Sequence, residues 1–364
     1  MEKKNRNRQV YITLFASIVI LLTIGVFMVA SSSWSEGIQE GLGGSHFLKR
    51  HFVFLGIGFF AGVVGFLFPK NAIRKLSFVL WIVSMAMCLL LFTGLAKSVN
   101  GSARWLEIPG IGFSFMPSDI LKYTSLFYVA NLLTIYRSRG KREGFWIILG
   151  VIAASVAIII LRDFSSAAVI GIALVSMFFV AGISGTELIT MGGLGAAGFF
   201  FMIKAFAYRM ERLMSFRDPF DDIADTDWQL ANSLYALGMG SITGVGYFQS
   251  RQKYSYVPES YNDFIFAILG EEFGFLGTSF VVLLFIVFVT CGLLVAYRKQ
   301  NFYDKVLVTG IVTSIGVQAF FNMGVASGIL PVTGITLPYI SYGGTALVLV
   351  MGMSGVLLDL ARRN

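Results

Sequence analysis

The stretch Arg251-Gln-Lys-Tyr-Ser-Tyr-Val-Pro-Glu-Ser-Tyr-Asn-Asp263 is rich in charged and polar residues and runs directly into the apolar sequence Phe264-Ile-Phe-Ala-Ile-Leu269. Apolar sequence of this kind, when it continues for about 20 residues, is typical of a membrane-spanning helix. A carboxylate such as Asp263 at the edge of a bilayer is costly unless it has a partner or a function. This junction therefore predicts a membrane protein with a charged site where a helix enters the membrane.

The composition of the whole chain agrees with that prediction. The chain has 364 residues, of which 56% are hydrophobic and 13% are charged, whereas soluble domains average about 25% charged residues. The net charge of +8 follows the expected topology, so it does not indicate nucleic-acid binding. Cys88 and Cys291 lie in apolar runs, and His46 and His51 have no cysteine or acidic companion. We therefore expect neither a disulfide framework nor a zinc site.

Ten apolar runs are long enough to cross a bilayer, which takes about 20 residues per helix. They predict an all-α, polytopic fold in which residues 1–364 form one membrane domain. The eighth run is long enough to include a turn at the membrane interface. The ten runs are 10–31, 52–68, 76–95, 117–135, 145–161, 164–182, 186–206, 263–296, 305–328 and 341–360.

Lysine and arginine gather in the N-terminus, the even-numbered connections and the C-terminus. Short loops rich in these residues stay in the cytoplasm, so both termini are expected there. The cytoplasmic loops are too short to hold a nucleotide-binding domain. The polar segments 96–116, 207–262 and 329–340 fall on the outer side, where we expect binding or chemistry. The segment 207–262, between the seventh and eighth runs, is the largest of these loops.

Two charged pairs mark helix junctions. Asp119 and Lys122 are three residues apart and face each other on one helix side. They are interpreted either as a buried ion pair that satisfies itself or as part of a site in which Lys122 or Arg104 meets an anionic headgroup. Arg162 and Asp163 lie in a tight turn and are interpreted mainly as a structural pair.

The remaining outer segments are distinctive for their charge and their broken helical pattern. Basic residues bracket the loop 207–262 at both ends, among them Arg212 and Lys253. Two prolines and several glycines interrupt the apolar pattern between Gly328 and Thr345. Non-helical backbone at membrane depth is tolerated only where protein buries it or where it lines a cavity. This segment and the long loop are therefore expected to line the same cleft.

The chain resembles the family of shape, elongation, division and sporulation proteins, which includes FtsW and RodA. The resemblance covers essentially the whole chain. It is strongest from Pro258 to Glu272, which includes Asn262-Asp263-Phe-Ile-Phe-Ala, and from Leu330-Pro-Val-Thr-Gly to Ser341-Tyr-Gly-Gly. The stretches Ser250-Arg-Gln-Lys253 and Arg212-Leu-Met-Ser-Phe-Arg-Asp-Pro219 are closer to FtsW than to RodA.

This resemblance implies a peptidoglycan glycosyltransferase of the bacterial cytoplasmic membrane. Such enzymes polymerise lipid II on the outer face, together with a class B penicillin-binding protein and other membrane proteins of the divisome or elongasome. The family's essential aspartate falls on Asp263. Two motifs depart from the family pattern: Leu161-Arg-Asp163-Phe-Ser lacks the usual Pro and Gly, and Pro117-Ser-Asp119 has Asp in place of Glu.

The hypothesis for the mechanism is a single inverting displacement. Asp263 would take the proton of the acceptor sugar hydroxyl as general base. Arg212 and Lys253, together with Arg104 and Lys122, would stabilise the leaving diphosphate. A divalent cation, Mg²⁺ or Mn²⁺, could share that task, and no other cofactor is expected. Glu259, four residues before Asp263, is a further substrate-binding candidate.

Two other functions are compatible with the sequence. A lipid II flippase would also have many spans and broken helices, although a transporter site is expected near the membrane midplane. A scaffold that recruits synthases would need no chemistry of its own. Loss of polymerisation in a folded Asp263→Ala protein would exclude the scaffold, and a translocation assay in vesicles would test the flippase.

Overall fold

Ten long helices dominate the part of the chain that the computed structural model describes, which comprises residues 2–99, 102–108, 113–139, 144–205, 216, 218–221, 228–254 and 256–363. Each of the ten predicted runs is one of these helices, so the polytopic helical prediction is confirmed. The helices are α1 (Glu2–Ser32), α3 (His46–Leu67), α4 (Lys70–Leu89), α5 (Pro117–Arg139), α6 (Gly144–Ile160), α7 (Phe164–Ala181), α8 (Gly185–Ala205), α11 (Ile265–Arg298), α12 (Phe302–Ala326) and α13 (Thr345–Arg362).

The surfaces of these helices are suited to lipid. Seven helices in the described ranges are long and apolar enough to cross a membrane, and the 17-residue α6 is a shorter apolar helix. Phe59 and Phe60 of α3 are 70% and 69% exposed. Soluble proteins rarely leave such contiguous apolar surface in water. The chain is therefore an integral membrane protein.

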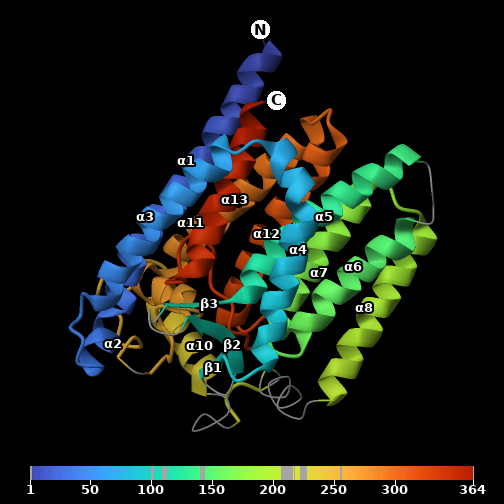
Figure 1. Ribbon diagram of the computed structural model, residues 1–364. Helices are drawn as coiled ribbons and strands as arrows, with labels where there is room; N and C mark the ends of the chain where they lie inside the picture. The colour runs from blue at the N-terminus through green and yellow to red at the C-terminus, as the bar shows by residue number, and fades with distance from the viewer. Residues whose placement is uncertain are drawn as a thin grey trace.

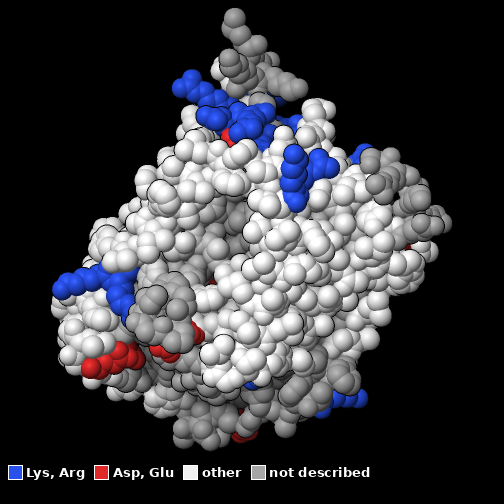
Figure 2. All heavy atoms as spheres, viewed as in Figure 1, with Lys and Arg blue, Asp and Glu red and all other residues white. Residues whose placement is uncertain are grey.

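Both termini lie at one end of the bundle, here named the termini end (Figure 1). Two short helices, α2 (Trp34–Gln39) and α10 (Trp228–Gly240), lie toward the opposite end. Figure 2 shows a cluster of lysine and arginine at the termini end, and further lysine and arginine together with aspartate and glutamate toward the opposite end. Most of the described surface between them on this face is uncharged.

A small antiparallel sheet, which the sequence did not predict, lies at the opposite end (Figure 1). Its strands are β1 (Ala96–Val99), β2 (Ser102–Ile108) and β3 (Phe113–Phe115), in the order β1-β2-β3. The pairing places Leu106 between Ala96 and Phe115, and Leu106 is buried. This pairing fixes the position of β2, which carries Arg104.

The interior of the bundle is built around α12. This helix packs against α11, α7 and α5, and it carries buried polar side chains, among them Gln318 and Asn322. Burying an amide is costly unless it is hydrogen-bonded. These side chains therefore require partners inside the protein.

The eighth predicted run contains a break, as its length suggested. Within α11, Gly274 has φ 66° and ψ −164°, a conformation that is not helical. The loop that follows α10 supplies hydrogen-bond acceptors at the break. The amides of Phe275 and Leu276 donate to the carbonyls of Ser241 and Ile242 at 2.9 and 3.1 Å. The loop after α10 is thus held against the first third of α11.

Gly274→Ala is expected to destabilise the protein. The backbone at Gly274 is in a region that only glycine adopts easily, and an added Cβ would lie 2.4 Å from the amide nitrogen of Gly244 and 2.5 Å from the carbonyl oxygen of Ile242. Backbone strain of this kind costs about 1–3 kcal/mol. The thermal unfolding midpoint in detergent should fall. In α6, Gly150→Ala is the matched control because a Cβ there meets nothing within 4 Å; equal midpoints for both variants would contradict the expectation.

Candidate functional site

A cavity of about 430 Å³ lies among the helix ends opposite the termini. Its wall is formed by α3, β2, β3, α5, α7, the turn before α11, α12, the segment between α12 and α13, and the start of α13. Aromatic, charged and amide side chains all contribute to it. The lining residues include Phe47, Arg50, Phe54, Trp105, Asp119, Lys122, Glu259, Tyr261, Asn262, Gln318, Gly334 and Tyr342.

Asp263 lies at the margin of this cavity, in the turn that precedes α11. It follows the lining residue Asn262, and its side chain is half-buried. A Cβ placed on the lining residue Gly334 would lie 3.6 Å from Oδ2 of Asp263. The carboxylate is therefore close to the segment between α12 and α13, as the sequence predicted.

Arg104 reaches the same glycine from the sheet. Its Nη1 would lie 2.7 Å from that Cβ and donates to the carbonyl of Gly334 at 3.5 Å. Its Nε donates to the carbonyl of Arg162 at 3.4 Å. The structure thus brings together a guanidinium and the carboxylate of Asp263, from segments that are far apart in the chain.

Lys122 and Asp119 form a buried ion pair, which is one of the two alternatives that the sequence left open. The Nζ of Lys122 is 3.3 Å from Oδ1 of Asp119 and donates to Oε1 of Gln318 at 2.7 Å. All three side chains also line the cavity. Lys122 therefore has protein partners and still contributes positive charge to the cavity wall.

Glu259 also lines the cavity, and its backbone is unusual. Its φ is 52°, which is uncommon for a residue with a long side chain. Its Oε2 accepts a hydrogen bond from Nδ2 of Asn262 at 3.4 Å. Such backbone conformations concentrate at functional sites. Glu259 therefore stays a substrate-binding candidate.

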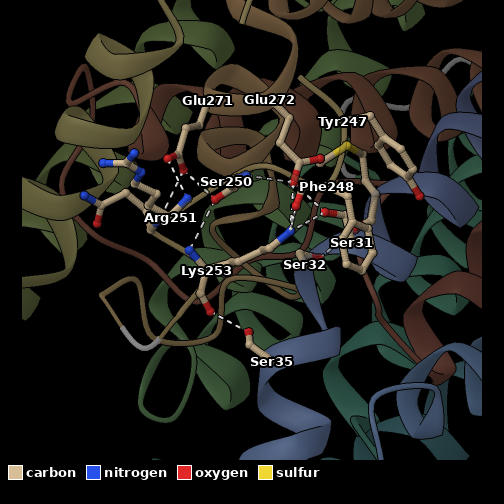
Figure 3. A network of polar contacts seen from close by, with 12 residues as sticks. Ser31, Ser32, Ser35, Tyr247, Phe248, Ser250, Arg251, Lys253, Glu271 and Glu272 are labelled. Atoms are coloured by element: carbon tan, nitrogen blue, oxygen red, sulfur yellow. Dashed lines mark hydrogen bonds and ion pairs between the residues drawn. The ribbon is translucent and has the colours of Figure 1, made fainter. Parts of the chain in front are cut away.

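Lys253 is placed differently from the prediction. Its ammonium is buried, lies 3.2 Å from Oε1 of Glu272, and donates to Oγ of Ser31 and to the carbonyl of Phe248 at 2.9 and 2.8 Å (Figure 3). Lys253 is not among the residues that line the cavity. Burial lowers the pKa of its ammonium, and Glu272 only partly offsets this. The geometry does not support a substrate-binding role, because this cation is already used inside the protein.

The neighbouring Glu271 anchors the same loop. Its Oε1 accepts a hydrogen bond from the amide of Arg251 at 2.8 Å, and its other oxygen accepts from the hydroxyl of Ser250 (Figure 3). The side chain of Ser35 in α2 donates to the carbonyl of Lys253 at 2.6 Å. Glu271 and Glu272 therefore hold the loop that leads to Asp263 against α11, and Ser35 holds it against α2.

The other predicted residues divide into two groups. Arg212 lies outside the described residues. Asp163 caps α7, because its Oδ1 accepts from the amide of Ser166 at 3.2 Å, and Arg162 stacks its guanidinium 4.8 Å from the ring centre of Phe92. The structural interpretation of the Arg162-Asp163 pair is thus supported.

The aromatic wall of the cavity was not predicted from the sequence. Phe47 lies 4.8 Å from Tyr261 and 5.6 Å from Tyr342, measured between ring centres. The amide of Tyr342 donates to the carbonyl of Tyr261 at 3.0 Å. Burial raises the pKa of the Tyr261 hydroxyl, so this group is protonated at neutral pH. In the sequence, only their position in the two motifs that match the family points to Tyr261 and Tyr342 as part of the cavity wall.

A divalent cation at the site was left open by the sequence. Among the residues that the structure describes, no group of three histidine, cysteine, aspartate or glutamate side chains is arranged to hold a metal ion. Cationic side chains, in contrast, are present at the cavity: Arg50, Lys122 and, beside Asp263, Arg104.

Comparison with known proteins identifies the family to which this chain belongs. The family model FTSW_RODA_SPOVE, described as "Cell cycle protein", matches residues 12–364. The chain belongs to the FtsW/RodA/SpoVE family. The resemblance to shape, elongation, division and sporulation proteins is thereby confirmed.

Individual relatives of this FtsW/RodA/SpoVE-family protein match over nearly their full length. A protein of Saccharophagus degradans named "Probable peptidoglycan glycosyltransferase FtsW" is 36% identical, with 98% of this chain and 95% of that protein covered. Stage V sporulation protein E of Bacillus subtilis is also 36% identical, with 94% of each chain covered.

Solved structures share the fold. The rod shape determining protein RodA of Thermus thermophilus superposes with a TM-score of 0.70 at 21% identity, covering 95% of both chains. A chain from a structure described as "Structural coordination of polymerization and crosslinking by a peptidoglycan synthase complex" gives a TM-score of 0.76 at 22% identity, covering 96% of this chain and 97% of that one. The architecture is therefore that of known polytopic membrane proteins of this family.

Proposed function

We propose that this FtsW/RodA/SpoVE-family protein is a peptidoglycan glycosyltransferase that polymerises lipid II, in the service of division septum synthesis. The observation that carries the proposal is the Asp263 carboxylate beside the Arg104 guanidinium, at the margin of a cavity at one end of an apolar bundle. A base next to a cation suits the transfer of a sugar from a diphosphate to a hydroxyl. The names of full-length relatives at 31–36% identity support it.

The proposed orientation puts both termini in the cytoplasm and the cavity at the outer face of the bacterial cytoplasmic membrane. The lysine and arginine gathered at the termini end support this orientation, because such residues are retained on the cytoplasmic side. Lipid-linked glycan would then reach the cavity from the outer leaflet, with its prenyl chain remaining in the membrane.

Asp263 is the proposed general base. It takes the proton of the GlcNAc 4-hydroxyl on the acceptor lipid II, and the hydroxyl oxygen forms a bond to the anomeric carbon of the donor. The bond from that carbon to the diphosphate oxygen breaks at the same time, and the undecaprenyl diphosphate leaves with the electron pair. A sugar hydroxyl is a weak acid at neutral pH, so a positioned base lowers the barrier.

The leaving diphosphate carries negative charge and needs cations. Arg104 is the first candidate because it lies beside Asp263 and can bind phosphate oxygens in a bidentate way. Lys122 is the second, although it already contacts Asp119 and Gln318. The mechanism uses these two side chains, and a divalent cation stays a prediction to be tested by chelation.

The proposed partners are a class B penicillin-binding protein and other membrane proteins of the division or elongation machinery. The structural neighbour with the TM-score of 0.76 comes from a synthase complex whose description joins polymerisation to crosslinking. A transpeptidase partner would crosslink the strands that this chain makes.

Polymerisation by the purified complex tests the proposal. The protein is co-purified with its class B partner, whose transpeptidase serine is inactivated, and supplied with labelled lipid II. We expect glycan polymer on a gel. Absence of polymer from an intact complex, together with lipid II translocation in vesicles, would establish the flippase function instead; absence of both activities would favour a scaffold.

Gly334→Ala is expected to lower polymerisation while leaving the fold intact. The new Cβ would lie 2.7 Å from Nη1 of Arg104, the mobile end of a long side chain, so the guanidinium moves and the backbone does not. Misplacing a catalytic group by about 1 Å costs on the order of 100-fold in rate. Gly343→Ala, also in the cavity wall, is the control because its Cβ meets atoms no closer than 3.4 Å. Equal rates and unfolding midpoints for both would contradict the role of Arg104.

A further inference from the structure

Two buried amide side chains lie one helical turn apart on α12 and face the catalytic region. Residues four apart in a helix share one face. Gln318 connects Lys122 to the segment before α13, because it accepts from Lys122 at 2.7 Å and donates through Nε2 to the carbonyl of Thr336 at 3.0 Å. Asn322 makes the more direct contact with the proposed base.

The Nδ2 of Asn322 donates to two carbonyls that belong to different segments. One is the carbonyl of Asp263 itself at 2.6 Å, and the other is that of Ile335 at 2.7 Å. Both distances are short for an amide donor. Asn322 is 1% exposed, so water does not compete for these bonds. One amide group therefore fixes the turn that carries the base relative to the segment that carries Gly334.

The orientation of this amide is determined by its surroundings. Turning it over would place its oxygen against two carbonyl oxygens, which repel it. In the orientation observed, Oδ1 of Asn322 is buried without a hydrogen-bond partner among the described residues. A buried acceptor without a partner is costly, so the stability of α12 alone does not account for an asparagine here.

We propose that Asn322 is a positioning residue for Asp263. It holds the backbone of Asp263 so that the carboxylate lies beside Gly334 and Arg104 at the margin of the cavity. Asn322 does not touch the substrate in this scheme and acts through the carbonyl of Asp263. This inference rests on the proposed function of Asp263 as general base.

The test is the polymerisation rate of the co-purified complex over a range of lipid II concentrations. Asn322→Ala removes both donors and is expected to lower the rate at saturation on the order of 100-fold, while the concentration at half-maximal rate stays near wild type. Asn322→Ser keeps one donor, so its rate at saturation is expected to lie between those of the wild type and Asn322→Ala. This variant also tests the proposal if the alanine variant fails to assemble. Asn232→Ala is the matched control, because that buried side chain donates within α10, to the carbonyl of Trp228 at 2.8 Å.

Hydrogen exchange gives a second measurement that does not depend on activity. The amides around 261–265 and 333–337 should both exchange faster in Asn322→Ala, while those of α6 and α7 stay as in wild type. Wild-type rates for Asn322→Ala, or faster exchange across the whole bundle, would overturn the positioning role. Asp263→Asn is assayed in parallel: if it polymerises normally, the proposed base is wrong, whereas an inactive Asp263→Asn beside a fully active Asn322→Ala removes only this inference.

Discussion

Asp263→Asn is expected to lower glycan polymerisation on the order of 10²- to 10⁴-fold, the usual contribution of a general base. Asparagine has nearly the same size and shape as aspartate but cannot accept the proton of the acceptor hydroxyl. The main-chain hydrogen bond from Asn322 to residue 263 is independent of the side chain, so the turn should keep its place. The measurement is the rate of polymer formation by the intact complex at saturating lipid II.

Two further variants make this result specific. Asp218→Asn changes an exposed carboxylate outside the cavity and should leave the rate unchanged. Glu259→Gln changes the carboxylate that lines the cavity four residues before Asp263. We expect Glu259→Gln to weaken substrate binding more than the rate at saturation. A larger loss for Glu259→Gln than for Asp263→Asn would move the base to Glu259.

Lys253→Met is expected to destabilise the protein by about 3–5 kcal/mol, because it leaves the buried carboxylate of Glu272 without its cation. The loop before Asp263 would lose its attachment to Ser31 and to the carbonyl of Phe248 as well. The thermal unfolding midpoint of the purified protein should fall, and polymerisation should fall with it only as the folded fraction is lost. Lys49→Met, which removes an exposed cation from α3, is the control.

The double variant Lys253→Met/Glu272→Gln is expected to recover part of that stability. Burial lowers the pKa of Lys253 despite the nearby Glu272, so desolvation weighs heavily against the pair. Removing both charges relieves this cost, as seen generally for buried ion pairs. A Lys253→Met protein that is as stable as wild type but fails to polymerise would instead restore the substrate-binding role that the sequence suggested.

The helices could be predicted from the sequence because a bilayer requires about 20 apolar residues for each crossing. The break in α11 was visible only as excess length. Its location at Gly274 depends on a loop that packs there, and hydrophobicity does not encode that contact. The sheet that carries Arg104 was not predicted, because its strands are short pieces of a polar connection.

The candidate site was predictable in part. Asp263 and Arg104 were each identified from the sequence, the first through family resemblance, but only the folded chain shows that both meet at Gly334. The substrate-binding role predicted for Lys253 rested on the charge pattern, which does not tell which way a side chain points. Its partner Glu272 is nineteen residues further along the chain and is buried in α11.

The most direct measurement is a structure of the Asp263→Asn complex with lipid II bound, since the inactive variant should retain its substrates. The acceptor 4-hydroxyl is expected at about 2.6–3.2 Å from the side chain of residue 263, with the donor diphosphate against Arg104. Lipid II bound with its diphosphate away from Arg104 and its acceptor hydroxyl out of reach of residue 263 would contradict the assignment of Asp263 as the catalytic base.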